Sequence, residues 1–334
     1  MVDFSNKKER ESQTWLNKLL GKIIPHEGNI KQVAAAVSGG CDSVALLFLM
    51  QHYCRIRGLD LCVFHVDHGL RNSPAADREW VESLARRLNL RFFWRKAQVS
   101  RHQISENEGI EAWARTFRYR SFQEMLSESG ASLVATGHTA DDQLETLLMR
   151  IFSGSSLQGM LAIRPQTEMN TGSGGIGVWR PMLEVQRSEL EQLLLKAGHD
   201  WLEDETNSSD VFLRNSVRHN LVPVVNSLFP KAAQKSAFLL KDIAQLQDYL
   251  SVQAKIFLDE NACENCLKLS PMPDILHREI IRQWLIRMGF DRQITRSLIE
   301  RIVELWNNKA GNRAVDHRSF KIVKKKQRLE FIKE

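Results

Sequence analysis

The stretch that decides the fold is Val33-Ala34-Ala35-Ala36-Val37-Ser38-Gly39-Gly40-Cys41-Asp42-Ser43-Val44-Ala45-Leu46. A strand of small residues runs here into a glycine turn, and an apolar helix follows. Consecutive glycines let the backbone turn several N–H groups toward one anion, and the positive end of the helix adds to the attraction. The hydroxyls of Ser38 and Ser43 supply further donors. This order of elements predicts a phosphate-binding loop.

The loop has no lysine, unlike the GxxxxGK[ST] nucleotide loop, whose lysine reaches the β- and γ-phosphates. It carries instead the carboxylate of Asp42, which suits Mg²⁺. We therefore expect cleavage between the α- and β-phosphates of a nucleotide. On this motif alone, an ordinary strand-to-helix turn with a Gly-Gly pair remains the alternative.

Composition points to a soluble protein with a polyanionic partner. The 334 residues are 43% hydrophobic, enough for two domain cores, and the net charge is +6. Residues 313–334 hold eight basic and three acidic side chains, and strand-like alternation there predicts a folded basic hairpin. Such a hairpin could bind RNA phosphates through Lys324, Lys325 and Lys326, although a solvated tail is the simpler alternative.

The chain shows no secretory or membrane signal. It begins with charged residues, and its apolar runs are much shorter than the roughly 18 residues that a membrane span needs. We therefore expect a cytoplasmic protein with no membrane partner. Five cysteines, an odd number, argue for mostly buried thiols rather than a disulfide framework.

Strands and helices alternate in the first part of the chain, which predicts an α/β fold: a parallel sheet with helices on both faces. Ligands of such sheets bind at the carboxyl ends of the strands. The expected strands are 33–37, 59–67, 91–97 and 131–137, and the expected helices are 43–55, 75–89 and 111–128.

After residue 222 the pattern changes to helices, expected at 231–257, 274–288 and 294–306. We therefore predict a catalytic domain over residues 1–222 and a smaller, mainly helical domain over 223–334 that ends in the basic hairpin. The glycine-rich residues 165–177 are interpreted as a mobile loop.

Polar side chains gather where the expected strands end. His65 and Arg71 follow the second strand, and the lack of nearby cysteines argues against zinc there. Arg115 lies with Glu111 and Arg118 on one helical face, where an ion pair within the helix is the simpler explanation.

The fourth strand leads to His138, Asp141, Asp142 and Glu145, at a helix start where acids often serve only as caps. Because they share the sheet edge with the glycine loop, we favour acid–base or Mg²⁺ chemistry. Arg214 and Arg218, one helical turn apart, suit phosphate binding.

In order along the chain, these segments resemble the tRNA(Ile)-lysidine synthetase family of PP-loop ATP pyrophosphatases. The matching motifs are SGGCDS, VDHGLR, ExxARxxRY, GHxADDQxET, RPML and DxxN…RNxxRH, and they cover about residues 33–222. Two departures are Thr139, where the family often has a second histidine, and the absence of room for the C-terminal domain of longer members.

The resemblance implies ATP, Mg²⁺, free L-lysine and a CAU-anticodon isoleucine tRNA as cofactors and partners, and a homodimer is left open. It implies catalytic roles for Asp42, His138, Asp142, Arg214 and Arg218, with Asp42 and Asp141 as Mg²⁺ ligands. ATP would be bound by Ser38, Gly39, Gly40, Cys41, Asp42, Ser43, His65, Arg71 and Arg115.

Two other functions compete with this one. A PP-loop tRNA thiolase would use a cysteine pair, for which Cys263 and Cys266 are the candidates, although a chance pair near a helix end is the simpler explanation. A tRNA-binding protein with a relict nucleotide site is the other, and intact Asp42, Asp141 and Asp142 argue against it.

Overall fold

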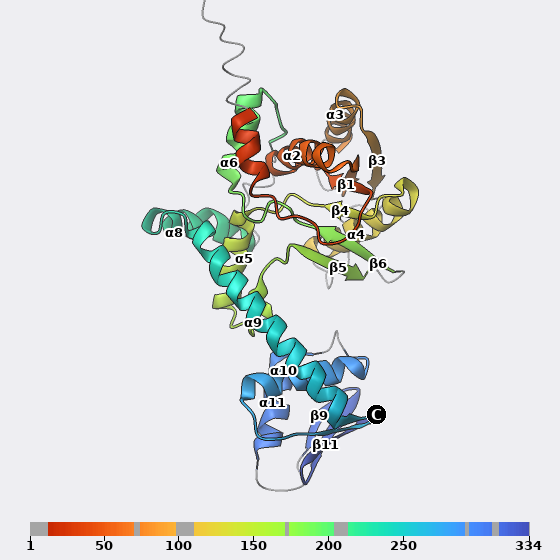
Figure 1. Cartoon of the computed structure of the whole chain (residues 1–334), viewed down its shortest axis with the longest axis vertical. Coiled ribbons are helices and arrows are strands. Elements are labelled where there is room, and N and C mark those ends of the chain that lie inside the picture. Colours follow the sequence, from red (N-terminus) through yellow and green to blue (C-terminus); the bar gives the residue numbers. More distant parts are fainter. Residues whose placement is uncertain are drawn as a thin grey trace, which may run out of the picture. The chain divides into compact units, whose positions relative to one another are not determined.

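The computed structural model describes residues 13–69, 74–97, 110–170, 174–203, 213–290, 294–308 and 314–333. The chain divides into two compact units (Figure 1), one formed by Met1–Met149 with Ala162–Phe238 and the other by Arg150–Leu161 with Leu239–Glu334. The division of roles on either side of residues 222 and 223 stays a prediction.

The first unit is built on a six-stranded sheet in the order β3-β2-β1-β4-β6-β5. All neighbouring strands run parallel except β5 and β6, which are antiparallel. This arrangement confirms the predicted fold class. The strands are β1 (Gln32–Ala36), β2 (Asp60–Asp67), β3 (Arg91–Lys96), β4 (Leu133–Ala135), β5 (Gln166–Asn170) and β6 (Gly175–Trp179).

Both faces of the sheet are covered by helices. Side chains of a strand alternate between its two faces, so a strand of apolar residues needs a packing partner on each side. On one face Val33 and Ala35 of β1 join a core with α2 (Cys41–Arg57), α3 (Pro74–Arg87) and α6 (Arg187–Ala197). On the other face Ala34 joins a core with α4 (Ile110–Ser129). After Gln32 the central strand β1 is therefore entirely apolar, and the polar residues that follow it lie at the sheet edge.

Further helices of this unit pack beside the sheet. Buried Ala140 and Leu144 of α5 (Ala140–Phe152) contact Val222 of α8 (Val222–Leu228) and Ala233 of α9 (Ala232–Asn261). Between α7 (Leu213–Ser216) and α8 the backbone forms a π-helical turn, η4 (Val217–Leu221). Pro223 explains it, because proline has no backbone N–H to donate and its ring clashes with the carbonyl four residues earlier.

The interpretation of residues 165–177 as a mobile loop is wrong over most of its length. Residues 166–170 and 175–179 form the hairpin strands β5 and β6, and β6 pairs with β4 inside the sheet. Ile176 and Val178 of β6 are buried against α4, and these alternating apolar residues stabilise the strand. Glycines are weak strand formers, and here packing outweighs that preference.

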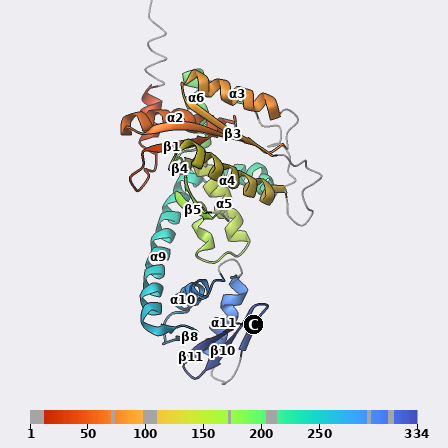
Figure 2. The same cartoon turned by 90° about the vertical axis from the view of Figure 1, so that its right-hand side faces the viewer.

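The second unit combines helices with a five-stranded antiparallel sheet in the order β7-β8-β11-β10-β9 (Figure 2). Its core contains Trp284, Phe320, Ile322 and Leu329. The predicted hairpin is confirmed as β10 (Phe320–Lys325) and β11 (Arg328–Lys333), whereas the three strands beside it were not predicted. The other elements are α10 (Asp274–Arg287), α11 (Arg296–Asn307), β7 (Ala262–Cys263), β8 (Cys266–Lys268) and β9 (Ala314–His317).

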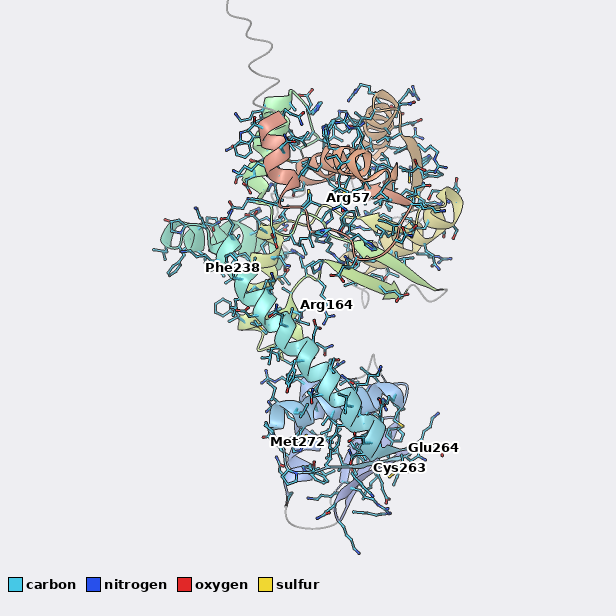
Figure 3. All side chains as sticks on the ribbon, viewed as in Figure 1. Arg57, Arg164, Phe238, Cys263, Glu264 and Met272 are labelled. Carbon is cyan, nitrogen blue, oxygen red and sulfur yellow. A yellow bond between two sulfur atoms is a disulfide. The ribbon has the colours of Figure 1, made fainter. Side chains whose placement is uncertain are left out.

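The cysteines behave in two ways. Cys41, Cys54 and Cys62 are buried thiols, as expected. Cys263 and Cys266 instead form a disulfide, because the tight turn between β7 and β8 brings their Cα atoms to 5.1 Å. This pair lies in a β-hairpin directly after the end of α9 (Figure 3), so the expected position near a helix end is confirmed, whereas the disulfide was not predicted.

Among the helices in the described ranges, none is long and apolar enough to span a membrane.

Candidate active site

The candidate site lies where the direction of the sheet's connections changes. From β1 the chain proceeds to β2 and β3 on one side, and it then returns to place β4 on the other side of β1. The carboxyl ends of β1 and β4 are therefore neighbours with loops that diverge, which is the usual ligand position in a parallel sheet. The glycine loop follows β1, and the turn with His138 follows β4.

The glycine loop is preorganised by its two serines. The Ser43 hydroxyl donates to the Gly40 carbonyl at 2.8 Å and accepts from the Ser38 amide at 3.1 Å. The two hydroxyl oxygens lie 3.2 Å apart. Helix α2 starts at Cys41, so its first amides and its positive end face the same loop.

Gly39 is required by both its backbone and its surroundings. Its φ is +99°, a conformation that other residues rarely adopt, and a Cβ atom would lie 2.7 Å from Cδ1 of Leu202. The Leu202 amide also donates to the Gly39 carbonyl at 2.9 Å. Leu202 therefore packs against the glycine loop and hydrogen-bonds to it.

Gly137 brings the β4 turn against the glycine loop. A Cβ atom here would lie 3.2 Å from the backbone carbonyl of Asp42 and 3.3 Å from the amide of Ser43. A side chain at this position would push the two segments apart. The contact confirms the expectation that the two motifs share one edge of the sheet.

The start of α5 is fixed by a reciprocal cap. The amide of Thr139 donates to Oδ2 of Asp142 at 2.9 Å, and the amide of Asp142 donates to Oγ1 of Thr139 at 3.4 Å. His138, just before it, has Nδ1 2.9 Å from the Thr136 hydroxyl. Asp142 therefore does cap the helix, as acids at this position often do, and it also pairs with two arginines.

Asp142 and Glu145 pair with both predicted arginines. Oδ1 of Asp142 accepts from Nη2 of Arg214 at 3.3 Å and from Nη2 of Arg218 at 3.2 Å. Glu145 accepts from Nε of Arg214 at 3.1 Å and from Nε of Arg218 at 2.6 Å. Glu145 is 2% exposed, so its charge needs these partners. The π-helical turn carries Arg218 into this cluster.

Asp42 has a different environment. Its Oδ1 is buried without a hydrogen bond, and Nε of Arg187 lies 4.0 Å from it. Burial, opposed by Arg187 and reinforced by Asp142, raises the pKa of Asp42 to about 6. Burial also raises the pKa of Asp141, whose Oδ2 accepts from the Arg187 amide at 2.8 Å.

These carboxylates fit Mg²⁺ as far as the chain can supply ligands. Within the described ranges, no three His, Cys, Asp or Glu side chains form a group that could hold a metal by themselves. Mg²⁺ usually takes only one or two carboxylates and completes its shell with phosphate and water oxygens. The buried Oδ1 of Asp42, which lacks a donor, suits such a ligand.

The protonation states of three groups in the site depend on burial and on neighbouring charges. Burial, with the neighbouring Arg180 and Arg214, lowers the pKa of His138 to about 4 despite Asp142, so His138 is neutral at pH 7. Burial opposes ionisation of Asp142, but the charges of Arg214 and Arg218, with the hydrogen bond from the Thr139 amide, hold the pKa of its carboxyl below the usual value. Burial and Asp42 raise the pKa of Cys41 to about 12, which leaves this thiol protonated and unreactive.

The structure spreads the remaining predicted ATP ligands more widely. His65 is buried under the glycine loop, with Nδ1 2.8 Å from the Val37 carbonyl. Arg115 is exposed on α4 with its guanidinium 4.9 Å from the Tyr119 ring centroid. Arg118, from the same helix, has Nη2 3.5 Å from Nε2 of His68. Arg71 lies outside the described residues.

The three predicted RNA-binding lysines have different surroundings in the second unit. The Lys324 ammonium donates to the carbonyls of Trp306 and Asn308 at the end of α11, so it serves as a helix cap. Lys325 is exposed and pairs with Glu330 at 2.6 Å. Lys326 is exposed at the hairpin turn with φ +53°.

Sequence reasoning missed Arg187, which contacts Asp141 through its amide and lies near Asp42. It follows the RPML segment at the start of α6, and nothing in its local sequence marks it as part of the site. Glu145 was recognised in the GHxADDQxET segment without a specific role. Its i, i+3 spacing from Asp142 places both on one helical face, which is the signal that could have paired it with the arginines.

A family model of the PP-loop domain matches residues 8–225, about two thirds of the chain. The chain belongs to the PP-loop family. Curated relatives named tRNA(Ile)-lysidine synthase include proteins from Solibacter usitatus (33% identity, 84% of this chain and 62% of that protein) and Dehalococcoides mccartyi (30%, 89% and 66%). Another, from Geobacter sulfurreducens, is 38% identical over 66% of this chain and 45% of its own length.

This PP-loop protein thus spans less than two thirds of the length of these relatives. A solved U34-tRNA thiolase from Methanococcus maripaludis shares the fold with a TM-score of 0.56 and 15% identity, covering 73% of this chain and 80% of the thiolase. At that identity the likeness concerns the fold alone.

Proposed function

We propose that this PP-loop protein ligates free L-lysine to C2 of the wobble cytidine, C34, of the CAU-anticodon isoleucine tRNA, and releases AMP and pyrophosphate. The observation that carries the proposal is the contact of the glycine loop with the His138 turn at the switch point of the sheet. The names of the curated relatives support it.

In the first step the C2 oxygen of the cytidine attacks the α-phosphorus of ATP. A bond forms between that oxygen and phosphorus, and the bond to the β-phosphate oxygen breaks. The glycine loop amides and the Ser38 hydroxyl are donors for the departing pyrophosphate. Asp42, with Asp141 near it, would hold Mg²⁺, which supplies neutralisation of phosphate charge when bound.

In the second step the ε-amine of lysine attacks C2, and the bond from C2 to the AMP oxygen breaks. The amine has an ordinary pKa of about 10.4, so roughly one molecule in 10³ is unprotonated at pH 7, a cost of about 4–5 kcal/mol. His138 is neutral at pH 7, so its ring can accept the proton that the nitrogen loses, and the negative charge of Asp142 favours the protonated ring that forms.

Arg214 and Arg218 stabilise phosphate charge in this proposal. Asp142 and Glu145 hold both guanidiniums in fixed positions before substrate binds. A preorganised cation requires little rearrangement when charge develops on a phosphate.

The test is incubation of the protein with ATP, L-lysine and the isoleucine tRNA, followed by mass analysis of the nucleoside at position 34. We expect lysidine, with one AMP and one pyrophosphate released for each product. Omission of lysine should leave adenylated tRNA, and the methionine tRNA with the same anticodon bases is the control for specificity. Unmodified cytidine in the complete reaction would refute the proposal.

The same reaction separates the alternatives. A relict nucleotide site would release no pyrophosphate, whereas a thiolase would place sulfur in the tRNA and need reactive thiols. Cys263 and Cys266 are joined to each other in the second unit, and the other three cysteines are buried. These observations favour the ligase over the thiolase.

A further inference from the structure

The glycine loop supplies hydrogen-bond donors for phosphate but no formal positive charge. Its donors are backbone amides, the hydroxyls of Ser38 and Ser43, and the N-terminal end of α2. In the GxxxxGK[ST] loop a lysine adds the charge that the β- and γ-phosphates need, and this loop has no lysine. A departing pyrophosphate is multiply charged, so we expect a cation from another part of the fold beside the loop.

The two arginines of the α7–η4 segment already have carboxylate partners. Asp142 and Glu145 each accept hydrogen bonds from both Arg214 and Arg218. Two positive charges therefore face two negative charges, and the cluster as a whole adds little net charge to the site. A further cation is needed to offset the charge of the outer phosphates.

Arg187, the first residue of α6, places a guanidinium beside the loop. Its Nε lies 4.0 Å from Oδ1 of Asp42 and donates to Oε1 of Glu191 at 3.3 Å. The side chains of Arg187 and Glu191 are 39% and 42% exposed, and an ion pair of this kind holds its partners weakly. In the described ranges the two Nη groups of Arg187 make no hydrogen bond, so these donors are available to a ligand.

The backbone of Arg187 is held firmly although its side chain is not. The Arg187 amide donates to Oδ2 of Asp141 at 2.8 Å. Gln186 and Glu189 form a reciprocal cap at the start of α6, in which each side chain accepts from the other residue's amide. Helix α6 also packs against α2, the helix that follows the glycine loop, in one apolar core. The fold therefore fixes where the guanidinium starts, and the side chain can still move toward a ligand.

We propose that Arg187 binds the β- and γ-phosphates of ATP and remains bound to the pyrophosphate that leaves, in place of the lysine that this loop lacks. The inference rests on the ATP-dependent step of the proposed function and not on the identity of the tRNA. A planar guanidinium can donate two parallel hydrogen bonds to phosphate oxygens. Once the Asp42 carboxylate binds Mg²⁺ it attracts Arg187 less, and the phosphates become the partner of the guanidinium.

Calorimetric titration with ATP, inorganic pyrophosphate and AMP, each with Mg²⁺, tests which phosphates Arg187 contacts. Arg187→Gln removes the charge and keeps most of the side-chain stem, and the backbone bond to Asp141 remains. We expect the dissociation constants for ATP and pyrophosphate to rise about tenfold to hundredfold, because hydrogen bonds between charged groups are lost. AMP lacks the two outer phosphates, so its dissociation constant should be unchanged, which also shows that the variant is folded.

Two further variants separate a phosphate contact from a general effect of charge. Arg187→Lys keeps a positive charge without the planar fork, so it should restore part of the lost pyrophosphate affinity. Arg57→Gln is the matched control, because Arg57 is an exposed arginine in the last turn of α2, at the end away from the loop (Figure 3). This control should leave all three dissociation constants at their wild-type values.

The outcomes distinguish this inference from the proposed function. Equal weakening of ATP, pyrophosphate and AMP binding in Arg187→Gln overturns the inference, because it would mean that Arg187 supports the shape of the whole site. Unchanged pyrophosphate binding in that variant, with ATP still bound by the wild type, overturns the inference alone. A wild-type protein that binds neither ATP nor pyrophosphate overturns the proposed function together with it.

Discussion

At the residue scale, the glycine loop depends on Gly39 for two separable reasons. Gly39→Ala adds strain at a φ of +99° and a contact of 2.7 Å with Leu202. We expect at least a tenfold loss of kcat/KM for ATP, because a displacement of about 1 Å at reacting groups can cost about 100-fold. Pyrophosphate release under steady-state conditions measures it.

The matched control is Gly198→Ala at the end of α6. Gly198 also has a positive φ, +70°, but a Cβ there meets nothing within 4 Å. This variant should lose about 1 kcal/mol of stability through backbone strain and keep its ATP kinetics. Equal loss of kcat/KM in both variants would mean that the loop contact with Leu202 is irrelevant.

For Asp42 we predict that the ionised carboxylate lowers the stability of the folded state although activity requires it. Its folded pKa of about 6 is raised, so ionised Asp42 destabilises the folded state at pH 8, and the penalty disappears as the pH falls below the unfolded value near 4. Asp42→Asn should therefore increase the free energy of unfolding by about 1–3 kcal/mol at pH 8 and change it little at pH 4, measured by urea unfolding without Mg²⁺ or nucleotide.

The same variant should lose nearly all ligase activity, because the neutral amide is a poor Mg²⁺ ligand of nearly equal volume. Retained activity, or lower stability at pH 8, would contradict the position assigned to Asp42.

Single residues also show what the sequence could reveal about the site. Asp42, His138 and Asp142 follow strand ends in recognisable motifs, so their proximity was predictable from the parallel sheet. Arg187 was not, because its approach to Asp42 depends on how the turn before α6 packs against α5. Charge alone was misleading at Lys324, whose ammonium caps a helix.

At the element scale, α9 and α10 are joined by a buried polar network around Glu279. This carboxylate accepts from Gln247 at 3.0 Å, from Arg282 at 2.5 Å and from Gln283 at 2.8 Å. Although burial opposes ionisation, Arg282 and Gln283 hold the pKa of Glu279 below its usual value. Its stabilisation is therefore complete above the unfolded pKa and is lost as the pH falls through the folded pKa.

We expect Glu279→Gln to reduce the stability of the second unit by about 2 kcal/mol at pH 7, because charged hydrogen bonds are lost. The deficit should shrink toward pH 3, where the wild-type carboxyl is also neutral. Hydrogen exchange of α9 and α10 amides, corrected for the intrinsic pH dependence, measures the difference. A deficit that does not change with pH would show that packing, not charge, is responsible.

Elements with strong apolar patterns were predictable, and those formed by distant pairing were not. Strands β1 to β3 and helices α2 to α4 lie close to their predicted ranges. Residues 165–177 were misread because their glycines disfavour strands, whereas pairing of β6 with β4 and burial of Ile176 stabilise a strand. The short strands β7 and β8 carry little local signal, since their pairing with β11 depends on the tertiary fold.

At the scale of the whole molecule, the net charge identifies a binding surface only when the positions of the charged side chains are known. The segment 313–334 is strongly basic, and the antiparallel strands β10 and β11 sort its side chains onto two faces of the sheet. Phe320, Ile322 and Lys324 lie on the face toward the core, whereas Lys325 lies on the other face. Composition predicted a polyanionic partner but could not make this distinction.

Lys325 and Lys326 should therefore bind RNA phosphates, and Lys324 should not. Replacing Lys325 and Lys326 with Gln should weaken tRNA binding and reduce the slope of log K against log salt by about 1–2, because each lost phosphate contact releases fewer counterions. Lys324→Gln removes the cap of α11 and should cost about 1 kcal/mol of stability while leaving the slope unchanged. Binding titrations at several salt concentrations compare the two variants. Equal slopes for the double variant and the wild type would show that Lys325 and Lys326 do not contact RNA phosphates.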